Sequence, residues 1–247
     1  MTDWLEGQVV DRQRWTQRLY SLRIEAPVEE FRAGQFTRVA LDIDGERVGR
    51  PYSLVNAPGE RPLEIYFNEV PEGPLSPRLA RLEPGDRVWV DRTPRGFFTL
   101  DEIPDAGQLW MLSTGTALGV FLSILRTRTP WRRFRDVVLV QGVRRAAELT
   151  YADTLAQIST RHPGQFTYVP VLSREDHAEA LHGRIPALLA GGGLEEATNL
   201  RLSPSHSQIM LCGNQGMIQD ATEHLKERGF KRNRRSEPGN ITTEKYW

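Results

Sequence analysis

The segment Gln108–Thr127, "QLWMLSTGTALGVFLSILRT", decides the fold of the second half of the chain. It joins a short apolar run, a turn of Ser, Thr and Gly, and an apolar stretch of helical length. Three later segments repeat this order and begin with "DVVLVQGV", "FTYVPVL" and "SQIMLCGN". Apolar β-type runs that alternate with helical patterns are typical of βα units on a parallel sheet. We therefore expect an open parallel α/β domain over residues 102–247.

Residues 1–101 read differently, as six short β-type runs with little helical pattern. The runs are "GQVVDRQRW", "LYSLRIEA", "GQFTRVALDI", "RVGRPYSLVNAP", "LEIYFNEV" and "DRVWVDRT". Turn residues such as Asp44-Gly45 and Pro84-Gly85 separate them, which predicts an antiparallel barrel or sandwich. One helix is expected at Leu75–Leu82, with Ser76 as its cap and Pro77 in its first turn. The boundary between the domains falls near "DEIPDAG", residues 101–107, where Pro, Gly and acids cluster.

Composition limits the possible functions. The chain has 247 residues, 39% hydrophobic and 26% charged, so it can bury a normal core. Lys plus Arg and Asp plus Glu are both 32, so the overall charge does not favour a nucleic-acid partner. Cys212 is the single cysteine, which excludes an intrachain disulfide and a four-cysteine iron–sulfur cluster.

The sequence also lacks the usual signals for metal binding and for export. The five histidines are scattered, so no metal site is expected. We see no signal peptide in the first fifteen residues and no apolar run of about 20 residues that could span a membrane. A cytoplasmic protein without a membrane segment is expected.

Ligands of open α/β sheets bind beyond the carboxyl ends of the strands, so the residues at those ends come first. The turn Ser113–Gly119, "STGTALG", can bring backbone N–H groups to an anion at a helix N-terminus. A tight turn with a Thr cap explains it equally well. Cys212 ends another apolar run, where a ring can lie against its thiol, although a small buried cysteine is the simpler interpretation.

Basic and hydroxyl residues follow two β-type runs of the predicted sheet. Arg144 comes after "DVVLVQGV", Ser173 and Arg174 come after "FTYVPVL", and Arg184 follows shortly after them. A guanidinium binds phosphate oxygens in pairs. Each arginine alone is better explained as a solvated charge, but the joint placement of Arg144, Ser173 and Arg174 leaves both a phosphate site and solvated charges open. The 2′-phosphate of NADP is a ligand that such a cluster suits.

The first domain offers "RPYS", Arg50–Ser53, at the end of a β-type run. With a period of two, Arg50 and Tyr52 share one face and Ser53 takes the other. Arg50 can pair with a phosphate, Tyr52 can lie on a ring, and Ser53 can bond to the edge of that ring. On composition alone, a half-buried strand aromatic is the simpler interpretation of Tyr52.

Taken in order, these motifs resemble the ferredoxin (flavodoxin)–NADP+ reductases of the short bacterial type. The resemblance covers essentially the whole chain and rests on "RPYS", "GPLSPRL", "GFFTLDEIP", "LWMLSTGTALG", "VLSRE", "HGRIPALL", "LCGNQGMI" and "EKYW". It implies an antiparallel β-barrel that binds FAD over residues 1–101 and an α/β domain that binds NADP(H) over residues 102–247. Val120, Gln141–Val143 and Arg145 depart from the family pattern.

The resemblance also assigns roles to individual residues. The implied FAD contacts are Arg50, Pro51, Tyr52, Ser53, Tyr66, Pro74, Leu75, Ser76, Thr116, Tyr246 and Trp247. The implied NADP contacts are Arg144, Ser173, Arg174, Arg184, Asn214, Gln215, Gly216 and Asp220. Ser53, Cys212 and Glu244 would orient the reacting rings. The C-terminal tail would return to the flavin, with Trp247 on the adenine and Tyr246 near the isoalloxazine.

The implied activity is FAD-dependent electron transfer between NADPH, which gives a hydride, and ferredoxin or flavodoxin, which takes single electrons. Such carriers are acidic, so a basic docking surface is expected at Arg126–Arg135, at Lys231–Arg235, or at both. A solvated charged face is the alternative for each run. A monomer is expected.

Three other functions stay open. The first is the reductase component of an oxygenase, against which the single cysteine argues, because such proteins usually add a Cys-rich iron–sulfur domain. The second is a general NADPH–flavin reductase or diaphorase. The third is a non-catalytic flavin-binding module, against which the intact "RPYS" and "EKYW" motifs argue.

Overall fold

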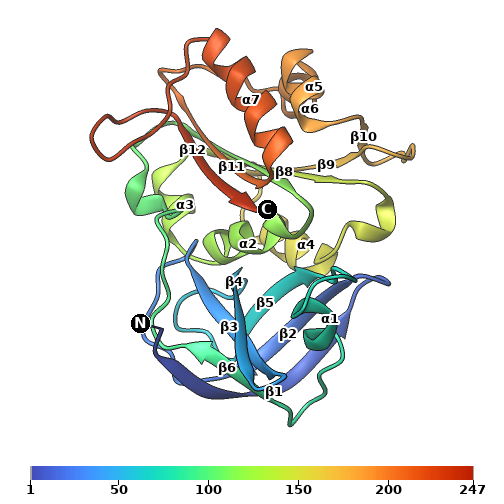
Figure 1. The fold of residues 1–247 in the computed structure, drawn as a ribbon. Helices are drawn as coiled ribbons and strands as arrows, with labels where there is room; N and C mark the ends of the chain where they lie inside the picture. Colours follow the sequence, from blue (N-terminus) through green and yellow to red (C-terminus); the bar gives the residue numbers. More distant parts are fainter. Residues whose placement is uncertain (1, 247) are drawn as a thin grey trace. The chain divides into compact units, whose positions relative to one another are not determined.

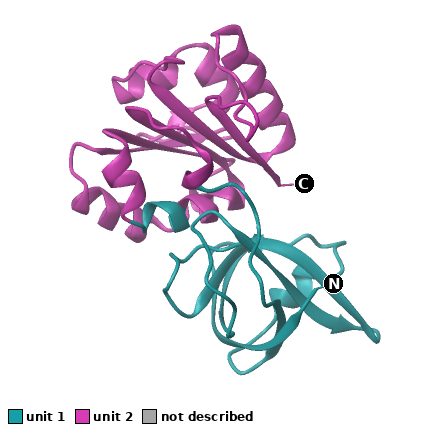
Figure 2. Cartoon of the chain, turned by 90° about the vertical axis from the view of Figure 1, so that its left-hand side faces the viewer, with its two compact units in different colours: residues 1–99, 122–127 teal, residues 100–121, 128–247 magenta. Residues whose placement is uncertain are grey.

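Antiparallel strands build the first of two units in the computed structural model, which describes residues 2–246. Unit 1 consists of residues 1–99 and 122–127, and unit 2 of residues 100–121 and 128–247 (Figure 2). The domain boundary predicted between residues 101 and 102 stays a prediction. Helix α2 is divided, since its last four residues are assigned to unit 1.

The sheet of unit 1 has six strands in the order β4-β3-β6-β1-β2-β5. They are β1 (Trp4–Arg14), β2 (Leu19–Glu25), β3 (Phe36–Ile43), β4 (Glu46–Ser53), β5 (Leu63–Asn68) and β6 (Arg87–Asp91). A bridge between Leu54 and Ile65 joins the two edges, so the sheet curls toward closure. Alternate side chains such as Leu22, Ile24 and Val90 fill its interior. The predicted antiparallel barrel is confirmed.

The helix predicted at Leu75–Leu82 is shorter, and its predicted cap is wrong. Helix α1 spans Ser76–Leu79, follows Leu75 as N-cap residue and has no side-chain cap. The Ser76 hydroxyl instead accepts a hydrogen bond from the Val70 N–H at 2.9 Å. After Leu79 the backbone bonds become those of tight turns, from Arg81 to Arg78 and from Leu82 to Leu79, which ends the helix.

Unit 2 contains a six-stranded parallel sheet in the order β10-β9-β8-β7-β11-β12 (Figure 1). Its strands are β7 (Gln108–Thr114), β8 (Asp136–Val143), β9 (Phe166–Leu172), β10 (Leu181–His182), β11 (Ser207–Asn214) and β12 (Ile241–Tyr246). The helices are α2 (Leu118–Leu125), α3 (Thr129–Arg133), α4 (Ala152–Arg161), α5 (Ile185–Ala190), α6 (Gly193–Thr198) and α7 (Gln215–Glu227). Short 3-10 turns are η1 (Leu100–Glu102), η2 (Gly115–Ala117) and η3 (Ala146–Glu148). The predicted parallel α/β fold is confirmed.

The C-terminal segment is a strand up to Tyr246. Strand β12 runs parallel to β11, from Ile241 beside Ile209 to Tyr246 beside Asn214. Backbone hydrogen bonds therefore order residues 241–246 as part of the sheet. Trp247, which the sequence analysis placed on the adenine, lies outside the described residues.

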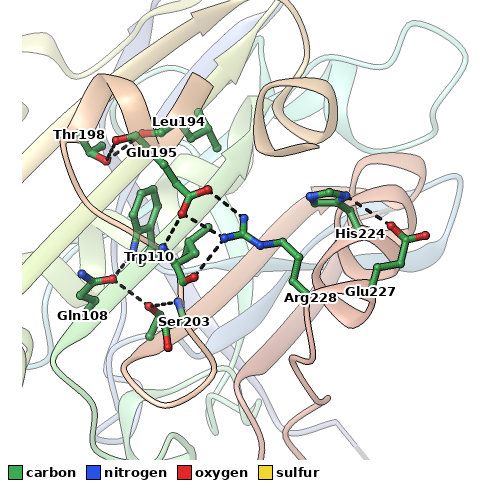
Figure 3. A network of polar contacts seen from close by, with 11 residues as sticks. Gln108, Trp110, Leu194, Glu195, Thr198, Ser203, His224, Glu227 and Arg228 are labelled. Atoms are coloured by element: carbon green, nitrogen blue, oxygen red, sulfur yellow. Dashed lines mark hydrogen bonds and ion pairs between the residues drawn. The ribbon is translucent and has the colours of Figure 1, made fainter. Parts of the chain in front are cut away.

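A polar network ties α6 to the end of α7 (Figure 3). The Glu195 carboxylate accepts two hydrogen bonds from Arg228, both at 3.0 Å, and one from the Leu202 N–H at 2.7 Å. Arg228 also donates to the Leu202 carbonyl at 3.1 Å. Burial pushes the pKa of Glu195 upward, but the hydrogen bonds from Arg228 and Leu202 outweigh it, and the pKa falls below its ordinary value.

Candidate active site and nucleotide site

Four side chains from neighbouring strands form a polar row near the carboxyl end of the sheet of unit 2. Glu244 on β12 is the register partner of Cys212 on β11, Cys212 of Ser113 on β7, and Ser113 of Gln141 on β8. Register partners in a parallel sheet point to the same face. The neighbouring residues Leu112, Val140 and Leu211 point to the opposite face, where α5 and α7 pack.

Burial raises the pKa of both Cys212 and Glu244 in the polar row, which favours their protonated, uncharged forms. Burial raises the pKa of the Cys212 thiol, the nearby Glu244 carboxylate raises it further, and a hydrogen bond with Tyr246 lowers it slightly. The thiol is therefore protonated at neutral pH. Burial also raises the pKa of Glu244 to about 7. Its Oε2 is buried and has no hydrogen-bond partner within residues 2–246. Glu244 can thus hold or release a proton near neutral pH.

Ser113 and Gln141, the other two members of the polar row, were not predicted as site residues from the sequence. The Ser113 hydroxyl donates to the Val140 carbonyl at 3.0 Å. The Tyr168 hydroxyl donates to Gln141 Oε1 at 2.7 Å, and Gln141 Nε2 is buried without a partner in the part of the chain that the structure describes. Ser113 and Gln141 could have been found from their polar character at the ends of apolar runs.

The ends of β7 and β11 are joined at the predicted "STGTALG" turn. The Thr114 hydroxyl accepts from the Asn214 N–H at 2.9 Å and does not cap a helix, so the alternative of a Thr cap at this residue is wrong. A Cβ on Gly213 would lie 2.1 Å from Thr114 Oγ1, so only glycine permits this approach. Thr116 lies in η2 and is partly exposed. The structure therefore puts Thr116 at the carboxyl end of β7, as predicted.

Helix α7 starts at the same edge. Asn214 is its N-cap, because its Oδ1 accepts from the Met217 N–H at 3.2 Å. Gln215 and Gly216 are exposed in the first turn, beside Asn214, while Asp220 lies exposed further along the helix.

The predicted arginine cluster gathers at the carboxyl ends of β8, β9 and β10. The Arg174 N–H donates to the Arg144 carbonyl at 3.0 Å, and the Ser173 N–H donates to the Val143 carbonyl at 3.1 Å. Arg184 is the N-cap residue of α5. The three arginines are exposed, and none forms an ion pair with an acid of the described chain. Guanidinium groups without carboxylate partners suit an anionic ligand.

In unit 1 the "RPYS" residues lie at the end of β4. Arg50 is exposed and donates to the Gly49 carbonyl at 2.9 Å. Tyr52 packs edge-on against Phe67 with ring centroids 5.9 Å apart, is half-buried, and has a pKa raised by burial. Pro51 and Ser53 are also partly exposed. An exposed guanidinium, a tyrosine ring and a hydroxyl on one strand end fit a ligand that combines a ring with phosphates.

The other predicted FAD contacts are more deeply placed. Tyr66 on β5 is 5% exposed and Leu75 is 1% exposed. The Pro74 carbonyl accepts from the Arg78 side chain at 2.8 Å, and the Ser76 hydroxyl accepts from the Val70 N–H. The predicted contacts of these residues with the cofactor stay predictions.

Neither metal ligands nor membrane helices stand out. Within residues 2–246, no three His, Cys, Asp or Glu side chains are grouped as a metal site. No helix among the described residues is long and apolar enough to cross a membrane.

Two family models match the chain, over separate residue ranges. Residues 9–99 match the oxidoreductase FAD-binding domain, and residues 111–223 match the oxidoreductase NAD-binding domain. Together with the fold, these matches define the chain as an oxidoreductase of the class that pairs an FAD-binding barrel with a nicotinamide-nucleotide domain.

Full-length relatives narrow this class. The flavodoxin/ferredoxin–NADP reductase of Escherichia coli is 48% identical over 248 residues, with both chains covered completely. The ferredoxin–NADP reductase of Pseudomonas aeruginosa is 31% identical, with 99% of this chain and 98% of the relative covered. The chain therefore belongs to the flavodoxin/ferredoxin–NADP reductase family.

Solved structures agree with this assignment. A ferredoxin NADP+ reductase from Neisseria gonorrhoeae with bound FAD and NADP superimposes with a TM-score of 0.94, at 32% identity and 99% coverage of both chains. A cytochrome P450 reductase from Amycolatopsis, 28% identical, has a TM-score of 0.80, but this chain spans only 69% of it. The predicted family, the enzyme class and the cofactors FAD and NADP(H) are confirmed.

Proposed function

We propose that the chain carries out the reaction of its family with the residues described above. It is an FAD-dependent oxidoreductase that moves electrons between NADPH and ferredoxin or flavodoxin. When bound, FAD supplies the redox chemistry, by taking a hydride from NADPH and passing electrons on singly. The protein supplies binding, orientation and electrostatics.

Unit 1 would bind FAD mainly through β4. The exposed guanidinium of Arg50 would pair with the FAD pyrophosphate, Tyr52 would stack on the isoalloxazine, and Ser53 would hydrogen-bond near its N5. Tyr66 and the loop Pro74–Ser76 would contact the rest of the cofactor.

The polar row carries the proposal for hydride transfer. The neutral Cys212 thiol and the Glu244 carboxyl lie side by side, and Tyr246 contacts the thiol. These groups would orient the nicotinamide ring, with Thr116 close to the place where the two rings meet. Glu244 Oε2 would hold a proton near the reacting atoms, which its pKa of about 7 permits at neutral pH. No covalent nucleophile is needed.

The arginine cluster would bind the adenosine end of NADP(H). Arg144, Arg174 and Arg184 would bind the 2′-phosphate together with the Ser173 hydroxyl, because the three guanidinium groups have no carboxylate partners in the described chain. Asn214, Gln215, Gly216 and Asp220 would line the rest of this site. The 2′-phosphate is absent from NADH, so the cluster would favour NADPH.

For the carrier, the two basic runs differ in how many of their charges form ion pairs. In Arg126–Arg135, three of the five arginines pair with acids: Arg126 with Glu60, Arg133 with Asp105, and Arg135 with Asp136. In Lys231–Arg235, only Arg235 has such a partner, Glu102, among residues 2–246. The second run keeps more free charge and is our preferred docking surface for an acidic ferredoxin or flavodoxin.

A cytoplasmic, monomeric protein is part of the proposal. The single cysteine, fully buried and reduced, fits a reducing compartment.

An anaerobic titration of the purified protein, first with NADPH and then with NADH, tests the reaction. We expect flavin absorbance bands that bleach readily with NADPH and poorly with NADH. Bands that stay unchanged with both nucleotides would contradict hydride transfer, and no bands after FAD addition would contradict the FAD site. A general flavin reductase would lose its flavin on gel filtration, whereas this protein should retain it.

A further inference from the structure

We infer that Glu175 is a positioning residue for the NADP phosphate site, one that holds the loop carrying Arg144 against the loop carrying Arg174. This inference rests on the proposed role of the arginine cluster. Glu175 ends the "VLSRE" motif, and its carboxylate binds a backbone N–H group.

The two loops are joined by hydrogen bonds from both sides. One loop follows β8 and the other follows β9. The Glu175 carboxylate accepts from the Ala146 N–H, across 29 residues of sequence. A second hydrogen bond joins the backbones of the two loops, because the Arg174 N–H donates to the Arg144 carbonyl at 3.0 Å. Within the first loop, the Glu148 carboxylate accepts from the Arg144 N–H at 2.9 Å.

Three acids of the two loops, Glu148, Glu175 and Asp176, bind groups other than the arginines. Glu148 and Glu175 bind backbone N–H groups, and Asp176 pairs with His182 at 2.8 Å. A carboxylate in a bidentate pair with Arg144 or Arg174 would compete with a phosphate for the same donors. By binding the Ala146 N–H, Glu175 orders the loop and leaves both guanidinium groups available.

The selectivity for the 2′-phosphate follows from this arrangement. Loss of the Glu175 contact leaves the loop after β8 less ordered. Arg144 must then be ordered when the nucleotide binds, and this ordering costs part of the free energy of NADPH binding. NADH makes no 2′-phosphate contact and is affected less. The polar row lies on β7, β8, β11 and β12, and the Glu175 contact does not involve it, so the turnover number with saturating NADPH is unchanged.

The test compares three variants of the FAD-loaded protein in steady-state assays with NADPH and NADH and a small dye acceptor. Glu175→Ala removes the acceptor of the Ala146 N–H. We expect the KM for NADPH to rise about tenfold with kcat unchanged, and the KM for NADH to change less than threefold. Glu175→Gln keeps an acceptor oxygen, and we expect it to stay within about threefold of the parent. Glu179→Ala makes the same truncation and charge change at an exposed neighbour and should leave all constants unchanged.

Equal losses with NADPH and NADH for Glu175→Ala, a large fall in kcat, or the same effect in Glu179→Ala would overturn the inference. So would a Glu175→Gln variant as impaired as Glu175→Ala. Arg174→Ala distinguishes a failure of the proposed phosphate site from a failure of the role of Glu175. If Arg174→Ala keeps full preference for NADPH, the proposed phosphate site itself fails; if it loses that preference while Glu175→Ala does not, only the role of Glu175 fails.

Discussion

Glu244 lies directly beside Cys212, on the neighbouring strand and the same face of the sheet. Glu244 is a carboxyl whose pKa burial raises to about 7, and Cys212 is a thiol whose pKa is raised first by burial and then by the Glu244 carboxylate. Two weakly acidic groups, a protonated thiol and a carboxyl that titrates near neutral pH, form the centre of the polar row. The predictions below start from this pair.

The first prediction concerns the pH dependence of stability. Below about pH 4.5 the Glu244 carboxyl is protonated in both the folded and the unfolded chain. Between pH 4.5 and 7 only the folded chain keeps the proton, so the free energy of unfolding falls as pH rises, by on the order of 3 kcal/mol in all. In Glu244→Gln this part of the decline should vanish, as measured by urea unfolding from pH 5 to pH 8. The same decline in parent and variant would contradict burial of the carboxyl.

The second prediction concerns hydride transfer. Cys212→Ala removes the thiol that contacts Tyr246 and adjoins Glu244, so the nicotinamide loses part of its orientation. We expect flavin reduction by NADPH in single-turnover stopped-flow to slow by roughly 10- to 100-fold. Met210→Leu, a volume-conserving change on the same face of β11, should leave the rate nearly unchanged. Equal rates in parent and Cys212→Ala would remove Cys212 from the proposed mechanism.

The third prediction concerns nucleotide preference. Arg144→Ala removes a charged donor from the proposed 2′-phosphate site. The Kd for NADPH should rise about 10- to 100-fold, whereas the Kd for NADH should stay within about threefold. Titration of the oxidised protein with NADP+ and NAD+ gives the same comparison without turnover. Arg161→Ala, at the exposed last residue of α4, is the control, and a shift of similar size there would show a general charge effect.

The fourth prediction concerns the carrier. The double variant Arg232→Glu, Arg234→Glu reverses two free charges in the preferred docking run. Electron transfer to an acidic ferredoxin or flavodoxin should slow at least tenfold at low salt and lose most of its salt dependence, while reduction of a small dye is unchanged. Arg128→Glu, Arg132→Glu makes the matched change in the other run. If that second pair has the larger effect, the carrier docks there.

The fifth prediction concerns the network in Figure 3. Arg228→Met leaves the Glu195 carboxylate, 7% exposed, without its main partner. The free energy of unfolding at pH 7 should fall by about 3 kcal/mol. Because the pKa of Glu195 is lowered in the parent, the stabilisation is present above the ordinary carboxyl pKa and is lost as the pH falls. The difference between parent and variant in urea unfolding should therefore shrink toward pH 4; a difference that stays constant would indicate lost packing only.

Much of the molecule could be read from the sequence because its signals are local. The period of apolar residues in "QLWMLSTGTALGVFLSILRT" specifies a strand, a turn and a helix, and the same order in later segments specifies a parallel sheet. The placement of Arg144, Arg174 and Cys212 at the carboxyl ends of strands followed directly, since each comes just after an apolar run. Resemblance to a known family supplied the cofactors.

Local signals failed where a group finds its partner outside its own helix or strand. Ser76 has the composition of a helix cap, yet its hydroxyl is taken by the Val70 N–H. The return of the C-terminal tail to the flavin stays a prediction, but no local signal in the sequence indicated that Ile241–Tyr246 pairs with β11 as strand β12.

The sequence by itself thus determined the two kinds of sheet, the order of the elements and the residue types at the strand ends. Only the tertiary structure decided that Glu244 faces Cys212, that Gln141 and Ser113 complete their row, and that Glu175 binds Ala146. The physical reason is that strand register and loop-to-loop contacts depend on which backbone and side-chain groups remain unpaired after packing. That balance involves the whole unit, and no short stretch of sequence contains it.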